Sequence, residues 1–166
     1  PEVRHTLRNR SRYEIANNSY ARGISLTLAN DCVGTGPRLQ MLTADAIANR
    51  FVEQEFFAWA DAVGLAEKLR TMRLARVSDG ESFGLLTSNP RIDSPVQLDL
   101  KLVEAEQVTS PILALDSYRY LDGIRFDENG NPISYDVLRE HPGDDAFSLT
   151  ENYDTIDANS ILHYFR

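Results

Sequence analysis

Residues 124–138, with the sequence IRFDENGNPISYDVL, decide how the second half of this chain folds. Two runs of strand-forming side chains, 124–126 and 133–138, flank a polar connection that contains Asn129-Gly130. An Asn-Gly step supplies the positive-φ positions that a tight hairpin turn requires. We therefore predict an antiparallel hairpin over this stretch.

Strand patterns also lie on both sides of this hairpin. Apolar residues alternate with polar ones over residues 96–102, which is the period-two pattern of a half-buried strand. Residues 82–88 form a further predicted strand, and the apolar run that starts at Ile161 predicts another. Beyond Ser78 the chain is therefore expected to form a mainly antiparallel sheet.

The first half of the chain has helical periodicity instead. We predict helices over residues 3–16, from Asn18 or Ser19 to about Asn30, from a cap at Thr43 to Val63, and from Ala66 to about Val77. Apolar and aromatic side chains recur on one side of the third helix, so we expect that side to be core. The residues predicted to supply much of the core are Phe51, Phe56, Trp59, Leu69, Leu98, Leu100, Ile124, Tyr135, Val137 and Leu162.

This order of elements, helices first and strands afterwards, indicates an α+β fold. A chain of 166 residues without an internal repeat has the size of one domain. We therefore predict a single domain over 1–166, with 1–78 mainly helical and 79–166 mainly strands. The chain begins without Met and stops directly after an apolar run, so we expect it to be a piece of a longer protein.

The composition excludes several classes of protein. Hydrophobic residues make up 42% and charged residues 25%, as in ordinary soluble globular chains, and no apolar run is long enough to span a membrane. The net charge of −8 disfavours a protein that coats nucleic acid. Cys32 is a single cysteine and forms no internal disulfide. Arginines cluster in residues 1–12 and acids in 136–157, and we interpret both clusters as solvated surface.

No constellation for chemistry stands out. The glycines at 34–37 lack the Lys and the preceding strand of a phosphate loop, and 127–131 lacks the spacing of a calcium loop. One cysteine with His141 and His163 cannot make a four-ligand zinc site without distant carboxylates. The serines considered as nucleophiles, none of which lies in a G-x-S-x-G elbow, are Ser82, Ser110 and Ser148. We predict no enzyme and no catalytic, cofactor-binding or metal site.

Two alternatives stay open. A metal-dependent hydrolase or nuclease would use carboxylates together with a histidine as metal ligands. Its candidate residues are Asp79, Glu81, Asp144, Asp145 and His141. A monomeric adaptor would instead bind another protein through the Arg-rich first helix, and it predicts an exposed apolar stripe along Val3, Leu7 and Ile15.

Several stretches together resemble the lambda-type portal proteins of tailed bacteriophages and prophages. The most specific is the segment NNSYARGI at 17–24, which leads through a helix to VGTG at 33–36. The other stretches, in the same order as in the family, are 59–61, 79–83, 97–106, 123–137 and 161–166. Ala105-Glu106 departs from the family's Pro-Asp, so the turn after that strand is the least well matched.

This resemblance implies a non-enzymatic structural protein without cofactors. It implies a portal wing-like fold and a homo-oligomeric ring, typically dodecameric, formed through the full-length chain at one capsid vertex. The ring would contact the terminase motor, capsid and head-completion proteins, and DNA would pass through it without sequence-specific binding. Its location would be the virion, after assembly in the cytoplasm of the bacterial host, with no membrane contact.

Overall fold

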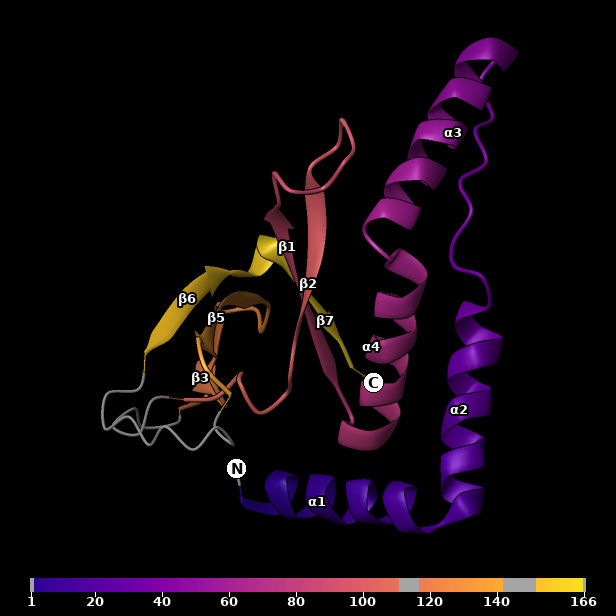
Figure 1. Ribbon diagram of the computed structural model, residues 1–166. Coiled ribbons are helices and arrows are strands. Elements are labelled where there is room, and N and C mark those ends of the chain that lie inside the picture. Colours follow the sequence, from indigo (N-terminus) through magenta and orange to yellow (C-terminus); the bar gives the residue numbers. More distant parts are fainter. Residues whose placement is uncertain (1, 111–116, 142–151, 166) are drawn as a thin grey trace.

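The computed structural model describes residues 2–110, 117–141 and 152–165, in which helices precede strands (Figure 1). The helices are α1 (Glu2–Asn17), α2 (Ser19–Val33), α3 (Ala46–Ala62) and α4 (Leu65–Asp79). The strands are β1 (Ser82–Ser88), β2 (Leu98–Val103), β3 (Tyr120–Leu121), β4 (Ile124–Phe126), β5 (Pro132–Leu138), β6 (Tyr153–Asp157) and β7 (Ile161–Tyr164), with a 3-10 turn, η1 (Ala158–Ser160), before β7. This order confirms the α+β class.

The helices are arranged around α4, which lies against the sheet that contains β1 (Figure 1). Helix α2 packs beside α4 through the small buried residues Ser25 and Ala29, which permit a close approach of the two backbones. Helix α1 crosses below the ends of α2 and α4. Among the described helices, none combines the length and apolar character needed to span a bilayer.

Helix α3 differs from the prediction in its cap and in its burial. The carboxylate of Asp45, not Thr43, caps it by accepting hydrogen bonds from the backbone N–H groups of Ile47 and Ala48. Helix α3 contains no buried residue, and the side chain of Phe51 is 62% exposed. The core assignment of Phe51 is therefore wrong. Periodicity identifies the apolar side of a helix, but here α3 extends away from the sheets and no described element covers that side (Figure 1).

The strands form two antiparallel sheets, with the orders β2-β1-β7 and β3-β4-β5-β6. The predicted hairpin is confirmed as β4–β5, joined by residues 127–131. Its turn uses one positive φ, at Gly130, and not two. The Asp127 carboxylate holds the turn instead, because it accepts hydrogen bonds of 2.8 Å from the backbone N–H groups of Asn129 and Asn131.

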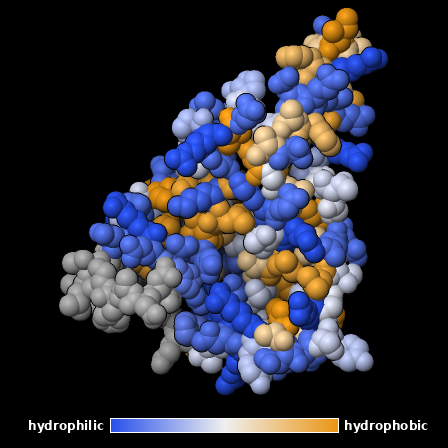
Figure 2. All heavy atoms as spheres, in the orientation of Figure 1, coloured by the Kyte–Doolittle hydropathy of each residue, from blue (hydrophilic) through white to orange (hydrophobic). Residues whose placement is uncertain are grey.

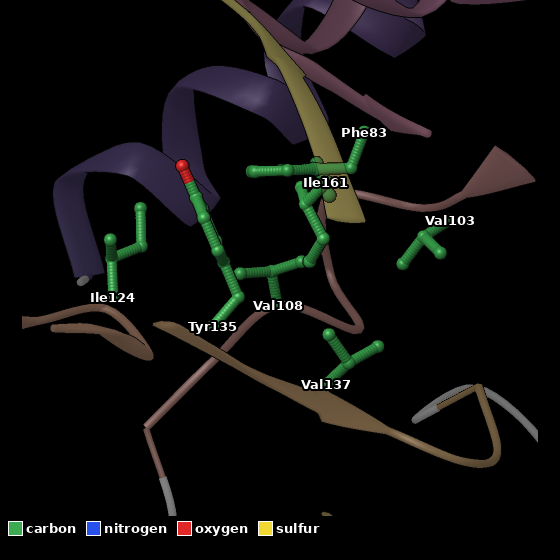
Figure 3. Close-up of a cluster of buried hydrophobic side chains, with 8 residues drawn as sticks. Phe83, Val103, Val108, Ile124, Tyr135, Val137 and Ile161 are labelled. Atoms are coloured by element: carbon green, nitrogen blue, oxygen red, sulfur yellow. The ribbon is translucent and has the colours of Figure 1, made fainter. Parts of the chain in front are cut away.

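The core lies between the two sheets, where side chains of β1, β2 and β7 meet those of β4 and β5 (Figure 3). Its buried members are Phe83, Val103, Ala105, Val108, Ile124, Tyr135, Val137 and Ile161. Of the predicted core residues, Leu100, Ile124, Tyr135 and Val137 are buried, and Phe56, Trp59 and Leu69 are half-buried.

Two further core predictions are wrong. Leu162 is exposed because β7 directs its neighbour Ile161 inward, and successive strand residues point to opposite faces. Leu98 is exposed because it stands at the first position of β2, at the end of the strand. Its backbone carbonyl accepts a hydrogen bond of 2.8 Å from the indole N–H of Trp59.

Candidate functional site

Three arginine side chains extend from one side of α1 toward the junction between α4 and the sheets. Arg4, Arg8 and Arg12 are spaced four residues apart, and this spacing places side chains on the same face of an α-helix. Their carboxylate partners come from three separate places in the chain: Asp79 and Glu81, Glu106, and Asp122. We call these seven residues the α1 charge network.

Glu81 is the centre of this network. Its side chain is 9% exposed and accepts hydrogen bonds from the guanidinium groups of Arg4 and Arg8. Burial opposes its charge, but the hydrogen bond from His163 and the charges of the two arginines outweigh burial and lower the pKa of Glu81. Arg4 also contacts Asp122, so one guanidinium joins the start of β1 to the turn before β4.

Arg12 provides the second anchor of α1. Its Nε and Nη2 atoms donate to the two carboxylate oxygens of Asp79 at 2.7 Å and 2.8 Å, a bidentate geometry, and its Nη1 donates to Glu106 at 2.8 Å. The hydrogen bonds to Asp79 outweigh burial and raise the pKa of the guanidinium. Helix α1 is thus fixed to the end of α4 and to the segment after β2.

The network continues into the core through His163. Its Nε2 lies 3.1 Å from Glu81 Oε2, and its Nδ1 lies 3.3 Å from the hydroxyl of Tyr135. The imidazole also stacks on Phe83, with 4.3 Å between ring centroids. The two sheets are therefore connected by polar as well as apolar contacts.

These observations correct the interpretation of the N-terminal arginines as solvated surface. The Arg8 side chain is 10% exposed, and the guanidinium of each of the three arginines binds a carboxylate from a distant part of the chain. The sequence signal that identifies them is their spacing of four, which Arg10 does not share. Their acidic partners carried no such signal, because only the fold brings them together.

His141 lies in a second cluster, with carboxylates that the sequence did not single out. Its Nε2 is 3.0 Å from Glu104 Oε2 and 3.3 Å from Glu106 Oε2, so three potential metal-ligand atoms converge. The second oxygen of Glu106 accepts from Arg12, so a cation here would compete with a guanidinium. Glu104 and Glu106 lie two residues apart in the turn after β2.

Those of the proposed hydrolase ligands that the structure describes do not form one cluster. The carboxylates of Asp79 and Glu81 bind arginines of α1, and among the described residues neither joins the His141 cluster. Asp144 and Asp145 lie outside the described residues, as does Ser148. Ser82 is buried, the Ser110 hydroxyl accepts a hydrogen bond from the Gly123 N–H at 2.9 Å, and Cys32 is exposed.

The glycine-rich segment and the apolar stripe of the first helix can also be assigned. Gly34 ends α2, and its N–H donates to the carbonyl of Asn30, so residues 34–37 form the predicted helix-terminating turn. Val3 and Leu7 are exposed, but Ile15 is half-buried beside α4. The continuous stripe that the adaptor alternative requires is therefore absent from the described part of α1.

Comparison with known proteins identifies the family. The chain matches the family model described as "Phage portal protein, lambda family" over residues 2–166, which is nearly its whole length. No curated protein matches the chain. The family is structural, and its proteins act as oligomeric rings at the capsid vertex with capsid and packaging partners. The chain belongs to the lambda family of phage portal proteins.

Proposed function

We propose that this chain is a structural subunit of a portal ring, typically of twelve copies, that forms the conduit for DNA packaging and ejection. The observation that carries this proposal is the family match over residues 2–166. The α1 charge network supports a structural role, because its charged side chains bind one another and join α1 to α4 and to the sheets.

The partners follow from this role. The ring would bind the terminase motor on one side and the capsid and head-completion proteins around it, first in the host cytoplasm and then in the virion. DNA would pass through without sequence-specific binding. The net charge of −8 fits a conduit, since like charges keep the phosphate backbone from adhering to the wall.

Electron microscopy and light scattering on the full-length protein test this proposal. We expect closed rings of many copies, because cyclic assemblies join a subunit's two different faces. A full-length protein that stays monomeric at high concentration would refute the portal role. DNA binding should remain weak at physiological salt, and tight binding to any one sequence would contradict the passive conduit.

The convergence of His141, Glu104 and Glu106 favours one alternative, a metal-dependent hydrolase. We propose that the protein is not an enzyme, because a surface ligand set alone supplies neither a nucleophile nor a substrate pocket. The test adds Mg²⁺, Mn²⁺ or Zn²⁺ and measures cleavage of DNA and of phosphate and ester substrates. Turnover that His141→Ala abolishes would establish the alternative, and no turnover is the expected result.

A further inference from the structure

Two arginines of α4 meet at one hydroxyl of β7. The Nη1 atoms of Arg73 and Arg76 donate hydrogen bonds of 3.1 Å and 3.0 Å to the hydroxyl oxygen of Tyr164. The guanidinium of Arg76 also lies over the Tyr164 ring, 4.5 Å from its centroid. Because both groups bind the same oxygen, where β7 ends beside α4 (Figure 1), they are held next to each other. We call Arg73 and Arg76 the α4 arginine pair.

The α4 arginine pair has no counter-ion in the part of the chain that the structure describes. The other half-buried arginines of the described ranges each bind a carboxylate, and they are Arg4, Arg8 and Arg12. Arginines of these ranges that lack a carboxylate elsewhere are exposed, so water hydrates them. Figure 2 shows strongly hydrophilic residues beside apolar ones along α4, so the pair is only partly surrounded by water. Two partly desolvated charges of like sign repel each other unless an anion joins them.

The site is rich in donors and lacks a charged acceptor. A guanidinium carries five N–H donors and no acceptor, and each member of the pair uses one of its donors on Tyr164. The Tyr164 hydroxyl accepts both bonds, and within the described ranges its own O–H donates to no other group. Tyr164 is 39% exposed, so a ligand can reach this place from solvent. An oxyanion would accept from both guanidiniums and remove their repulsion.

We propose that the α4 arginine pair binds a side-chain carboxylate from an acidic segment of a partner protein. Carboxylates are the anions that the half-buried arginines bind elsewhere in this chain. DNA is the less favoured ligand, because the net charge of −8 repels a continuous line of phosphates more than it repels a short acidic segment. The site concerns a protein contact and does not depend on the DNA conduit.

The test measures peptide binding to the full-length protein by fluorescence polarisation. The probe is a labelled peptide of alternating glutamate and glycine, and its partner probe has glutamine in place of glutamate. We expect wild type to bind the glutamate peptide and not the glutamine peptide. The double variant Arg73→Gln/Arg76→Gln should weaken binding by about tenfold or more, since it removes both charge-assisted donors. Added salt should weaken the wild-type complex, as for an ion pair at the surface.

Two further variants separate the pair from general charge. Arg50→Gln is the matched control, because it removes the same charge from an exposed arginine of α3 that forms no ion pair within the described ranges. It should leave peptide binding unchanged. Tyr164→Phe keeps the ring under Arg76 and removes the shared oxygen, so it should weaken binding several-fold. Circular dichroism and urea unfolding check that each variant is folded.

Ring assembly, followed by light scattering, is the second measurement. If rings already cover the site, wild type binds no peptide and the double variant weakens assembly by about tenfold, which identifies the acidic segment as part of the next copy. Absent peptide binding with unchanged assembly overturns the inference and leaves the portal role intact. Equal losses for Arg50→Gln and the double variant, or tighter binding of a DNA oligonucleotide at the pair, also overturn it. If wild type forms no ring, the portal role is refuted and the peptide result still decides the inference.

Discussion

Replacing Glu81 by glutamine removes a buried negative charge while it preserves the shape of the side chain. In the wild type this carboxylate accepts hydrogen bonds from Arg4 and Arg8 and lies 3.1 Å from His163. Removing one partner of a buried ion pair costs about 3–5 kcal/mol, because the other charge stays buried. Arg4 is partly exposed and recovers water, so we expect Glu81→Gln to lower the free energy of unfolding by about 2–4 kcal/mol.

The assay is urea unfolding followed by fluorescence and circular dichroism, with the midpoint and slope compared at pH 7. Glu128→Gln is the control, because Glu128 makes a similar ion pair with Arg119 at 3.1 Å on the surface. That control should change the free energy of unfolding by less than about 1 kcal/mol. If Glu81→Gln lowers the free energy of unfolding no more than the control does, the argument that the network fixes α1 is refuted.

The same variant gives a pH test. The pKa of Glu81 is lowered in the folded protein, so its stabilising effect is complete above its unfolded pKa of about 4.3. The effect is lost as the pH falls through the lower, folded pKa. The difference in stability between wild type and Glu81→Gln should therefore shrink in acid, and a difference that stays constant down to pH 3 would contradict the assignment.

Three further changes test the rest of the fold. Gly123→Ala should lower the free energy of unfolding by about 3 kcal/mol or more in urea, because Gly123 has a positive φ and the added Cβ would lie 2.7 Å from the backbone of Thr109. The control Gly130→Ala, whose added Cβ meets no atom within 4 Å, should lower it by only about 1 kcal/mol. Burial and the hydrogen bond to a carboxylate raise the pKa of Tyr120 to about 12, so stability should fall between about pH 10 and 12. In ultraviolet absorbance, Tyr120→Phe should remove one late phenolate titration and leave that of Tyr135, whose pKa burial also raises. Asp45→Ala should destabilise α3 by about 1 kcal/mol and speed amide exchange in its first turn, and unchanged exchange would show that the cap is not needed.

The local patterns of the sequence were sufficient for the four helices, the hairpin and the strands β1, β2 and β7, but not for β3 or β6. The hairpin at 124–138 follows from its Asn-Gly turn, and β2 follows from the period-two alternation over 96–102. Both signals depend on neighbours along the chain. The end of α2 at Gly34 follows from local conformation in the same way, whereas α4 continues to Asp79, beyond its predicted end at about Val77. Even so, period two leaves the choice of face open, and this is why Leu162 was assigned to the core in place of Ile161.

The family, too, could be identified from the sequence, since ordered motifs along the chain resemble portal proteins and the family match covers residues 2–166. What the tertiary structure alone decided is which charges meet and which apolar sides stay uncovered. Glu81 is buried against Arg8 of α1 although 73 residues separate the two along the chain, and Phe51 is exposed although its helix has an apolar side. Ion pairing and burial depend on proximity in space, and no local pattern of residues encodes which distant segment will be the neighbour.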